Sequence, residues 1–206
     1  MSGPTATVAI VNWNGREHLA TCLPSVFALD HPASAFECVV VDNGSTDGSV
    51  AWLAREWPQV RVVANPDNRG FAAAANDAAN AAAGDVVAFL NNDCRVERTW
   101  LARLTEALGA TGAAAAGSCM LDWEGTRVDF GGPAMNFHGH GSHRGWNRPY
   151  APDPAAAPEP ALFGCGGALA VDRARFLAAG GFDGDYFAYF EDVDLGWRLW
   201  VLGERV

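Results

Sequence analysis

Short apolar runs alternate with helical patterns about every 20 to 25 residues through the first 121 residues, and this alternation constrains the fold more than any other feature. Buried strands are expected at 5–11, 36–41, 60–64, 85–93 and 113–121. Helical periodicity separates them, at 16–29, 50–57, 71–84 and 97–109. Since parallel strands need helical crossovers of this kind, the pattern predicts an α/β fold with a mostly parallel sheet covered by helices.

The alternation stops at residues 122–160, which are rich in Gly, Pro and His and too polar for a core. We interpret this stretch as a long excursion beside a functional site. The stretch contains three histidines that could form a zinc site, His138, His140 and His143. However, no cysteine is close in sequence, and the histidines lack the helical spacing that would hold them as ligands. A flexible loop facing a substrate is the preferred interpretation. A strand at 161–171 and two further helices then complete the pattern.

Charge limits the class of partner. The chain carries 14 basic and 24 acidic residues, a net charge of -10, which argues against nucleic acid or an anionic membrane as a general partner. An anionic ligand would need a metal or a few local arginines. Half of the residues are hydrophobic, which is enough for a sizeable core, and the length of 206 residues suits one α/β domain or one that is cut short.

The five cysteines are scattered and never spaced as C-x-x-C, which is typical of reduced core thiols in a cytosolic protein. The N-terminus lacks the basic and apolar regions of a signal peptide, and no apolar run reaches the ~18 residues of a membrane helix. We therefore expect a cytoplasmic protein without a transmembrane segment. Peripheral association with the inner face of the plasma membrane could come only from a bound ligand or from segments outside this chain.

Polar clusters follow four of the predicted strands. They lie at 12–15, 42–47, 65–70 and 91–93. Because ligands bind at the carboxyl ends of the strands in an open parallel sheet, we expect the four clusters to meet along one rim and form a binding site.

Each cluster has a functional reading and a structural alternative. Asp42 could accept a hydrogen bond from the imide N–H of a pyrimidine base, or "DNGSTD" could only cap a helix. Arg69 could hold a diphosphate at a helix N-terminus opened by Gly70, or be a solvated loop arginine. If the segment is extended, the side chains of Asn91 and Asp93 point the same way and could bind Mg²⁺ or Mn²⁺. The structural alternative is that these residues only form a polar turn.

The segment "FEDVDLGWRLW" places three carboxylates, Glu191, Asp192 and Asp194, at the start of a helix. Acidic residues favour a helix N-terminus, and Asp194 can pair with Arg198 four residues later, so a structural reading exists. However, the preceding "YFAYF" is too aromatic for a free surface. A carboxylate held against aromatic rings and beside other carboxylates has a raised pKa, which suits a general base.

Together these segments resemble glycosyltransferase family 2, the inverting nucleotide-sugar transferases of GT-A fold. The matching segments occur in the family's order and cover nearly the whole chain: "VNWNG" (11–15), "VVDNGSTDGS" (40–49), "NRGFAAAAN" (68–76), "FLNND" (89–93), "GCGGALAVDR" (164–173) and "YFEDVDLGWRL" (189–199). Several of them are most similar to the bacterial rhamnosyltransferase-like branch, which builds cell-surface polysaccharides.

The resemblance implies a Rossmann-like GT-A fold and a role for each matching residue. Pyrimidine-base contacts would come from Val11, Asn12 and Asp42, and diphosphate and ribose contacts from Arg69 and Asn91. The metal, Mg²⁺ or Mn²⁺, would be bound by Asp93. Backbone at Gly166 and Gly167 would approach the sugar, Asp192 would be the catalytic base, and Glu191 would orient the acceptor or the base. Residues 1–121 would form the nucleotide-sugar-binding half and residues 122–206 the acceptor and catalytic half.

The implied reaction moves a sugar from a UDP- or dTDP-sugar, rhamnose among the candidates, to a hydroxyl of a polysaccharide or glycolipid acceptor. Two departures from the family stand out: Asn91 replaces the first carboxylate of the Asp-x-Asp motif, and the sequence ends soon after the acidic helix. We expect a single domain that is truncated at its C-terminus, and a non-catalytic nucleotide-sugar-binding domain stays open as the alternative.

A dinucleotide-dependent oxidoreductase is disfavoured because "VNWNGREH" follows the first strand where G-x-G-x-x-G is required. A sugar nucleotidyltransferase is disfavoured because the Gly-rich, Arg-containing loop expected near its start is missing.

Overall fold

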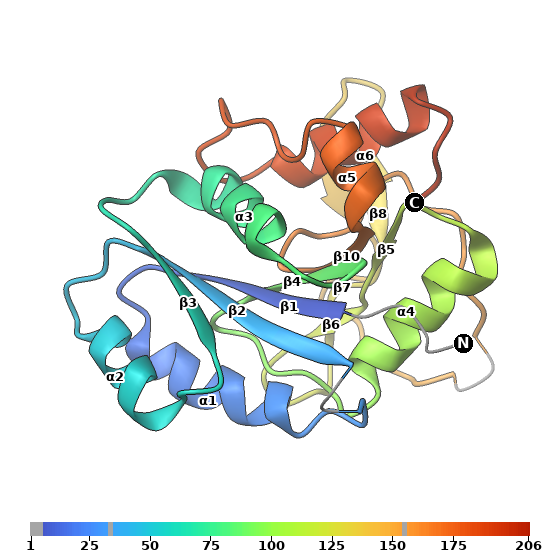
Figure 1. The fold of residues 1–206 in the computed structure, drawn as a ribbon. Coiled ribbons are helices and arrows are strands. Elements are labelled where there is room, and N and C mark those ends of the chain that lie inside the picture. The colour runs from blue at the N-terminus through green and yellow to red at the C-terminus, as the bar shows by residue number, and fades with distance from the viewer. Residues whose placement is uncertain (1–5, 33–34, 154–155) are drawn as a thin grey trace.

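The computed structural model describes residues 6–32, 35–153 and 156–206 and contains a six-stranded central sheet. Its strands are β1 (Ala6–Asn12), β2 (Phe36–Asn43), β3 (Arg61–Asn65), β4 (Val86–Asn91), β5 (Ala115–Gly117) and β10 (Ala168–Asp172). The spatial order is β3-β2-β1-β4-β10-β5 (Figure 1). β3, β2, β1 and β4 are parallel to one another, whereas β10 pairs antiparallel with both of its neighbours. The mostly parallel α/β sheet predicted from the alternation is confirmed.

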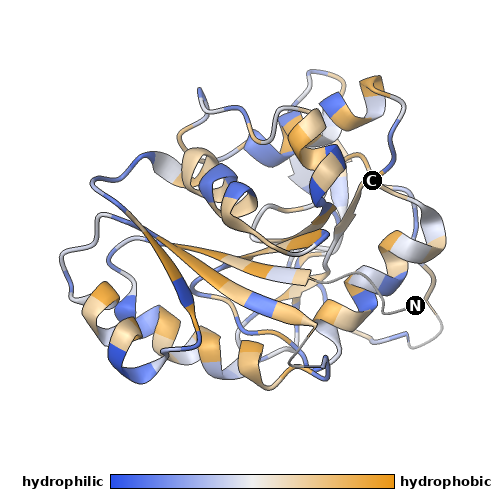
Figure 2. Ribbon diagram, in the orientation of Figure 1, coloured by the Kyte–Doolittle hydropathy of each residue, from blue (hydrophilic) through white to orange (hydrophobic). Residues whose placement is uncertain are grey.

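Helices cover both faces of this sheet. They are α1 (Arg16–Phe27), α2 (Ser49–Glu56), α3 (Gly70–Ala81), α4 (Trp100–Thr111), α5 (Arg173–Ala178) and α6 (Glu191–Val201). Figure 1 shows α1, α2 and α4 on one face and α3, α5 and α6 on the other. Each face has its own apolar core, and the hydrophobic strands run between the two (Figure 2). Strands buried on both faces explain why the sequence runs are continuously apolar rather than alternating.

The predicted strand at 113–121 is wrong in one respect, because the structure divides it between two sheets. β5 ends at Gly117, and β6 (Met120–Leu121) then pairs with β7 (Val128–Phe130) in a separate two-stranded sheet. The division follows from a close approach: a Cβ at Gly117 would lie 3.0 Å from the Cα of Gly164. The predicted strand at 161–171 is likewise only β10, because the glycine-rich residues before it form a turn in which Ala168 N–H donates to Cys165 O at 3.0 Å.

The excursion at 122–160 is not a structureless loop. Besides the β6–β7 ribbon it forms a second hairpin of β8 (Pro133–Met135) and β9 (Gly141–His143). In the turn of this hairpin the Asn136 side chain accepts hydrogen bonds from the His138 and His140 N–H groups. The hairpin lies against α6, since a Cβ at Gly141 would be 3.0 Å from the Val193 side chain. The histidine stretch is therefore part of an ordered hairpin next to the acidic helix.

Each of the five cysteines is free, as the sequence predicts. Burial raises the pKa of the Cys22 and Cys94 thiols to about 12, so neither is a thiolate near neutral pH. The expectation that all five are core residues is wrong for Cys119, which is exposed. Within the described part of the chain, no helix has the length and apolar character needed to cross a bilayer.

Two glycines inside helices offer a matched test of the packing. A Cβ at Gly196 in α6 would lie 2.5 Å from both the carbonyl oxygen of Leu162 and the Cβ of Phe163, whereas Gly109 in α4 has open space around it. We expect Gly196→Ala to destabilise the protein by about 1–3 kcal/mol, since backbone must move. Gly109→Ala should stabilise it by about 0.5–1 kcal/mol through helix propensity.

Thermal unfolding of the two variants would check this prediction, because about 1 kcal/mol shifts Tm by roughly 2–4 °C in a chain of this size. A fall in Tm for Gly196→Ala with a small rise for Gly109→Ala is the expected result. Equal effects of the two substitutions would contradict close packing between α6 and the 162–163 segment.

Candidate active site

The polar clusters at the ends of β1, β2 and β4 meet in a single hydrogen-bonded rim, as their positions predict. Asn12 pairs with Asp42 in the β1–β2 register, and its side-chain amide donates to the Asp42 carboxylate at 2.9 Å. From the other side, Asn92 Nδ2 donates to Asn12 Oδ1 at 2.8 Å. The end of β3 joins through Asn65, whose Nδ2 donates to Asn43 Oδ1 at 3.0 Å. Strand order and side-chain chemistry therefore place all four clusters along the same edge of the sheet.

Asp42 lies at the centre of this rim and is 1% exposed. One carboxylate oxygen accepts from Asn12, and the other accepts from the Ser45 N–H at 2.8 Å, which closes the turn after β2. "DNGSTD" therefore forms a turn that ties the β1 and β2 loops together, but Asp42 does not cap α2, whose N-cap residue Gly48 has no side-chain cap hydrogen bond. A ligand N–H would have to use a second lone pair of one of these oxygens.

Arg69 immediately precedes α3, and the first amides of that helix are already occupied. Gly70 N–H donates to Asn68 Oδ1 at 3.0 Å, and Phe71 N–H donates to the Phe187 carbonyl at 2.7 Å. Gly70 has φ +82°, and its backbone approaches the Phe187 carbonyl so closely that a Cβ would overlap it. Arg69 itself is paired with Asp77 at 3.0 Å and is half exposed. An anion here would depend on the Arg69 side chain rather than on these two amides.

The expectation that β4 extends to Asp93, with Asn91 and Asp93 pointing the same way, is wrong. β4 ends at Asn91, and a hydrogen bond of 3.1 Å from Cys94 N–H to Asn91 O closes a turn over the next residues. Asn91 lies against Gly167: its N–H donates to the Gly167 carbonyl at 2.9 Å. Asp93 is exposed, with only a weak contact of 3.9 Å from the Cys94 thiol.

The free carboxylate of Asp93 fits a divalent cation, but as one ligand rather than as a complete site. No cluster of three or more His, Cys, Asp or Glu side chains able to hold a metal occurs among residues 6–32, 35–153 and 156–206. Mg²⁺ commonly binds one or two carboxylates together with substrate phosphates and keeps several waters, and Mn²⁺ takes the same oxygen ligands. A cation at this rim would therefore be shared with a phosphate-bearing ligand.

Glu191 opens α6 and is the most deeply buried carboxylate of the acidic segment, at 5% exposed. Burial raises its pKa to about 7, and the neighbouring charge of Asp192 adds to the shift. Its Oε2 atom has no hydrogen-bond partner among the described residues. A proton is therefore held on Glu191 to a much higher pH than on an ordinary glutamate.

Asp192 is half-buried and held by two backbone N–H groups. Its Oδ2 accepts from Gly166 N–H and its Oδ1 from Val193 N–H, both at 2.8 Å. Burial raises the pKa of Asp192 above its usual range, although these hydrogen bonds oppose the shift. A Cβ at Gly166 would lie 3.4 Å from Glu191 Oε1 and from the Phe71 ring, so this glycine lets the backbone reach the carboxylate pair. The result is an oriented carboxylate with an elevated proton affinity, which is what a general base needs.

The segment before α6 is strained and exposed. Tyr189 and Phe190 have φ values of +72° and +70°, a conformation that costs a non-glycine residue about 1–3 kcal/mol. The prediction that "YFAYF" is too aromatic for a free surface is wrong, because Tyr189 is 83% exposed and Phe187 and Phe190 are also on the surface. The predicted Asp194–Arg198 pair is confirmed at 2.8 Å, and Arg198 also donates to the Ala179 and Gly181 carbonyls.

The structure also brings Asp129, on β7, toward the site. Its charge contributes to raising the pKa of the Cys94 and Cys165 thiols. Cys94 adjoins Asp93, and the charges of Asp192 and Glu191 also act on Cys165. β7 pairs with β6, whose Met120 side chain would lie 3.5 Å from a Cβ at Gly167, so Asp129 belongs to a ribbon that packs beside the site. No sequence motif marked it, because it is a lone aspartate within the irregular excursion.

Comparison with known proteins agrees with the sheet and its rim. The sequence model of the family described as Glycosyl transferase family 2 matches residues 7–176. The chain is 31% identical over 131 residues to glycosyltransferase AglE of Haloferax volcanii, and the alignment covers 62% of this chain and 40% of AglE. It is 29% identical over 219 residues to the N-acetylglucosaminyl-diphospho-decaprenol L-rhamnosyltransferase of Mycobacterium tuberculosis, and this alignment covers 95% of this chain and 70% of the relative.

Two solved structures share the fold. The mannosyltransferase PcManGT from Pyrobaculum calidifontis, in complex with GDP-Man and Mn²⁺, superposes with a TM-score of 0.72 at 23% identity, over 100% of this chain and 54% of that protein. GalNAc-T7 with UDP, GalNAc and Mn²⁺ gives a TM-score of 0.75 at 20% identity, over 99% of this chain and 42% of that protein. At these identities the likeness supports the GT-A fold alone.

Proposed function

This chain belongs to glycosyl transferase family 2, and we propose that it is an inverting glycosyltransferase whose catalytic base is Asp192. The observation that carries the proposal is the Asp192 carboxylate, fixed by the Gly166 and Val193 N–H groups and given a raised pKa by burial. In the reaction the acceptor hydroxyl oxygen forms a bond to the anomeric carbon while the bond from that carbon to the donor phosphate breaks. The hydroxyl proton passes to Asp192. Attack opposite the leaving group inverts the anomeric configuration.

The donor end of the proposed site is the polar rim. Asn12 and Asp42, with the backbone of Val11, hold a pyrimidine base, and Asn91 lies near the ribose. Arg69 contacts the diphosphate, for which it would have to share or leave its ion pair with Asp77. The Asp93 carboxylate holds a divalent cation, which offsets charge on the departing diphosphate when bound.

Gly166 and Gly167 would complete this end by bringing the backbone close to the sugar. In the structure Gly166 adjoins Glu191 and Asp192, and Gly167 adjoins Asn91, so these two glycines lie between the proposed ribose contact and the proposed base. We assign residues 1–121 to donor binding and residues 122–206 to the acceptor and the base. This division places the leaving group and the nucleophile on opposite sides of the two glycines.

A UDP- or dTDP-sugar is the proposed donor, with rhamnose among the candidate sugars, and a saccharide or lipid-linked saccharide is the proposed acceptor. Support comes from the mycobacterial relative, which is named an L-rhamnosyltransferase of a diphospho-decaprenol-linked sugar and aligns with 95% of this chain. GalNAc-T7 was solved with UDP, whereas PcManGT was solved with GDP-Man, so a test of the donor must include a purine nucleotide.

Thermal shifts with UDP, dTDP, GDP and NAD, each with and without Mn²⁺, test the donor site. A ligand present at about 100 times its Kd stabilises the folded state by about 2.7 kcal/mol, which corresponds to roughly 5–10 °C in a chain of this size. We expect a shift of this order with a pyrimidine diphosphate plus Mn²⁺ and none with NAD.

Asp93→Asn should remove the Mn²⁺-dependent part of that shift while leaving the Tm without ligand unchanged, because Asp93 is exposed. The matched control is Asp185→Asn, an exposed aspartate in the loop before α6 with no proposed role. A shift with GDP alone would replace the pyrimidine proposal by a purine donor. The absence of a shift with every nucleotide would contradict the donor site.

A further inference from the structure

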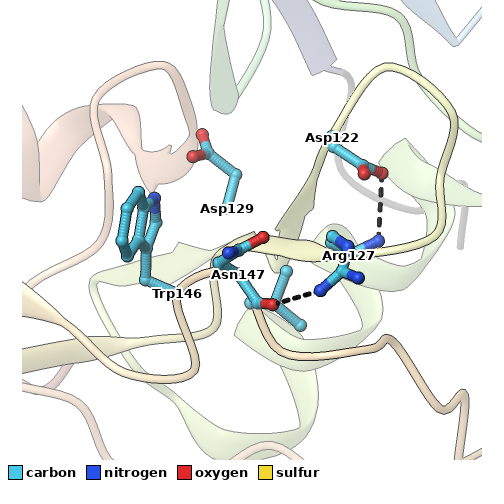
Figure 3. Close-up of a pocket in the computed structure, with 6 residues that line it drawn as sticks. Asp122, Arg127, Asp129, Trp146 and Asn147 are labelled. Carbon is cyan, nitrogen blue, oxygen red and sulfur yellow. Dashed lines mark hydrogen bonds between the residues drawn. The ribbon is translucent and has the colours of Figure 1, made fainter.

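A small cavity opens on the surface at the β6–β7 ribbon. Its volume is about 100 Å³. The lining residues come from the β6–β7 ribbon and from the segment that pairs with it: Asp122, Arg127, Val128, Asp129, Trp146 and Asn147. In Figure 3 the Trp146 indole and the Asp129 carboxylate lie on one side of this cavity and Arg127 on the other. None of these residues belongs to the motifs that indicate the donor site.

Most polar groups of the lining are engaged in holding its shape. The Asp122 carboxylate accepts from the Thr126 and Arg127 N–H groups at 2.7 and 3.0 Å. The Arg127 guanidinium donates to the Asn147 carbonyl at 2.8 Å. The shape of the cavity is therefore held by hydrogen bonds within the protein and does not depend on a ligand.

Two side chains of the lining remain available to a ligand. Trp146 is 67% exposed, although an indole is a large apolar group. Asp129 is exposed, and within the described ranges its carboxylate has no hydrogen-bond or ion-pair partner. An open aromatic face beside an unpaired acceptor suits a ligand that has both an apolar surface and hydroxyl donors.

The ribbon that carries the cavity packs beside the reaction site. Phe130, which follows Asp129 on β7, has its ring centroid 6.5 Å from that of Phe163, and Met120, its partner on β6, would lie 3.5 Å from a Cβ at Gly167. Cys165 directly precedes Gly166, whose N–H holds Asp192. The β6–β7 ribbon is therefore in contact with the Gly166–Gly167 backbone that holds Asp192.

We propose that this cavity is an acceptor subsite for a neutral sugar ring, with the apolar ring face against Trp146 and ring hydroxyls donating to Asp129. The inference rests on the proposed glycosyltransferase function and assigns the position of the acceptor. Pyranose rings present C–H groups on one face and hydroxyl donors at the edge, which matches an indole beside a carboxylate. The lining carries the two carboxylates of Asp122 and Asp129 against the single guanidinium of Arg127, so its net negative charge disfavours an anionic sugar.

Indole N–H resonances of the ¹⁵N-labelled protein test the subsite directly, without any need for turnover. The probes are methyl N-acetyl-β-D-glucosaminide, methyl β-D-glucoside and methyl α-L-rhamnoside, each titrated to about 50 mM because single sugar rings bind with Kd values near the millimolar range. Trp146→Phe identifies the Trp146 resonance. At least one probe should shift that resonance saturably, while the resonance of Trp197, which is similarly exposed at 61% on α6, stays in place.

Asp129→Asn should weaken the binding of that probe at least about fivefold, since it removes a charge-assisted hydrogen bond. Glu124→Gln, an exposed carboxylate in the turn of the same ribbon, should leave it unchanged. No saturable shift of Trp146 with any probe, or equal binding by Asp129→Asn and the wild type, would overturn the subsite. A nucleotide thermal shift on the same preparation separates the two proposals, because intact donor binding with a silent Trp146 rejects the subsite alone.

Discussion

Replacement of Asp192 by asparagine is expected to lower kcat by about 10²- to 10⁴-fold while leaving the affinity for the nucleoside diphosphate nearly unchanged. Asparagine has almost the same shape but cannot take the proton of the acceptor hydroxyl. One of its two polar atoms is an NH₂ group, which would face the N–H of Gly166 or Val193, so a loss of stability of about 1 kcal/mol is expected as well. The contacts proposed for the base and the diphosphate lie at the polar rim, away from Asp192, whereas Gly166, which Asp192 holds, is proposed to approach only the sugar.

Steady-state kinetics with saturating donor, together with nucleotide titration of the same variant, would check this prediction. Asp185→Asn is the matched control, since Asp185 lies exposed in the loop that leads to α6. If Asp192→Asn lost donor affinity in proportion to turnover, Asp192 would belong to the donor site and the assignment of the base would be wrong.

The buried carboxylate of Glu191 should make the stability of the protein depend on pH in an unusual direction. Burial raises its pKa from 4.5 to about 7, so between these values the folded protein holds a proton that the unfolded chain has released. The folded state then binds more protons, and the free energy of unfolding must fall as the pH rises through this window. The shift corresponds to a loss of roughly 3 kcal/mol between pH 4.5 and 7.

Chemical denaturation at pH 5 and pH 8 would measure this loss against that of Glu191→Gln, which does not titrate. We expect the wild type to lose roughly 3 kcal/mol more than the variant over this interval, because titrating groups that do not interact with Glu191 cancel in the comparison. Glu124→Gln, an exposed glutamate, should behave as the wild type does. Identical pH slopes for wild type and Glu191→Gln would show that Glu191 is an ordinary solvated acid.

The parts of the fold that could be predicted from the sequence are those that depend on local patterns. β1 to β4 and the helices between them follow from apolar runs buried on both faces and from helical periodicity. The convergence of Asn12, Asp42 and the polar end of β4 was predictable too, because parallel strands end at the same edge of a sheet.

Features that depend on long-range contacts were not predictable in the same way. The split of residues 113–121 depends on the approach of Gly117 to Gly164, 47 positions apart in the sequence. The turn that redirects Asp93 depends on one backbone hydrogen bond rather than on residue type. Asp129 belongs to the β6–β7 ribbon, which packs beside Gly167, and a single aspartate in a polar stretch carries no periodic signal.

The acidic segment 191–194 combines features that could be predicted from the sequence with one that could not. Its spacing predicted the Asp194–Arg198 pair, and the crowding of carboxylates predicted a raised pKa. The assumed cause was different from the observed one. The aromatic residues 186–190 do not bury the carboxylates, because Phe187, Tyr189 and Phe190 are exposed. Instead, Gly166 lies next to Glu191, and the Phe71 ring lies beside the same glycine.

The most direct test of the central claim is the anomeric configuration of the product. The chain would be incubated with UDP- and dTDP-sugars, Mn²⁺ and the methyl glycoside acceptors, and the anomeric protons of donor and product compared by NMR. The account predicts a new glycosidic bond of opposite configuration to the donor, formed by the wild type and lost in Asp192→Asn. A product of retained configuration would contradict the single displacement. Donor binding without any product would contradict the transferase and favour a domain that only binds nucleotide-sugar.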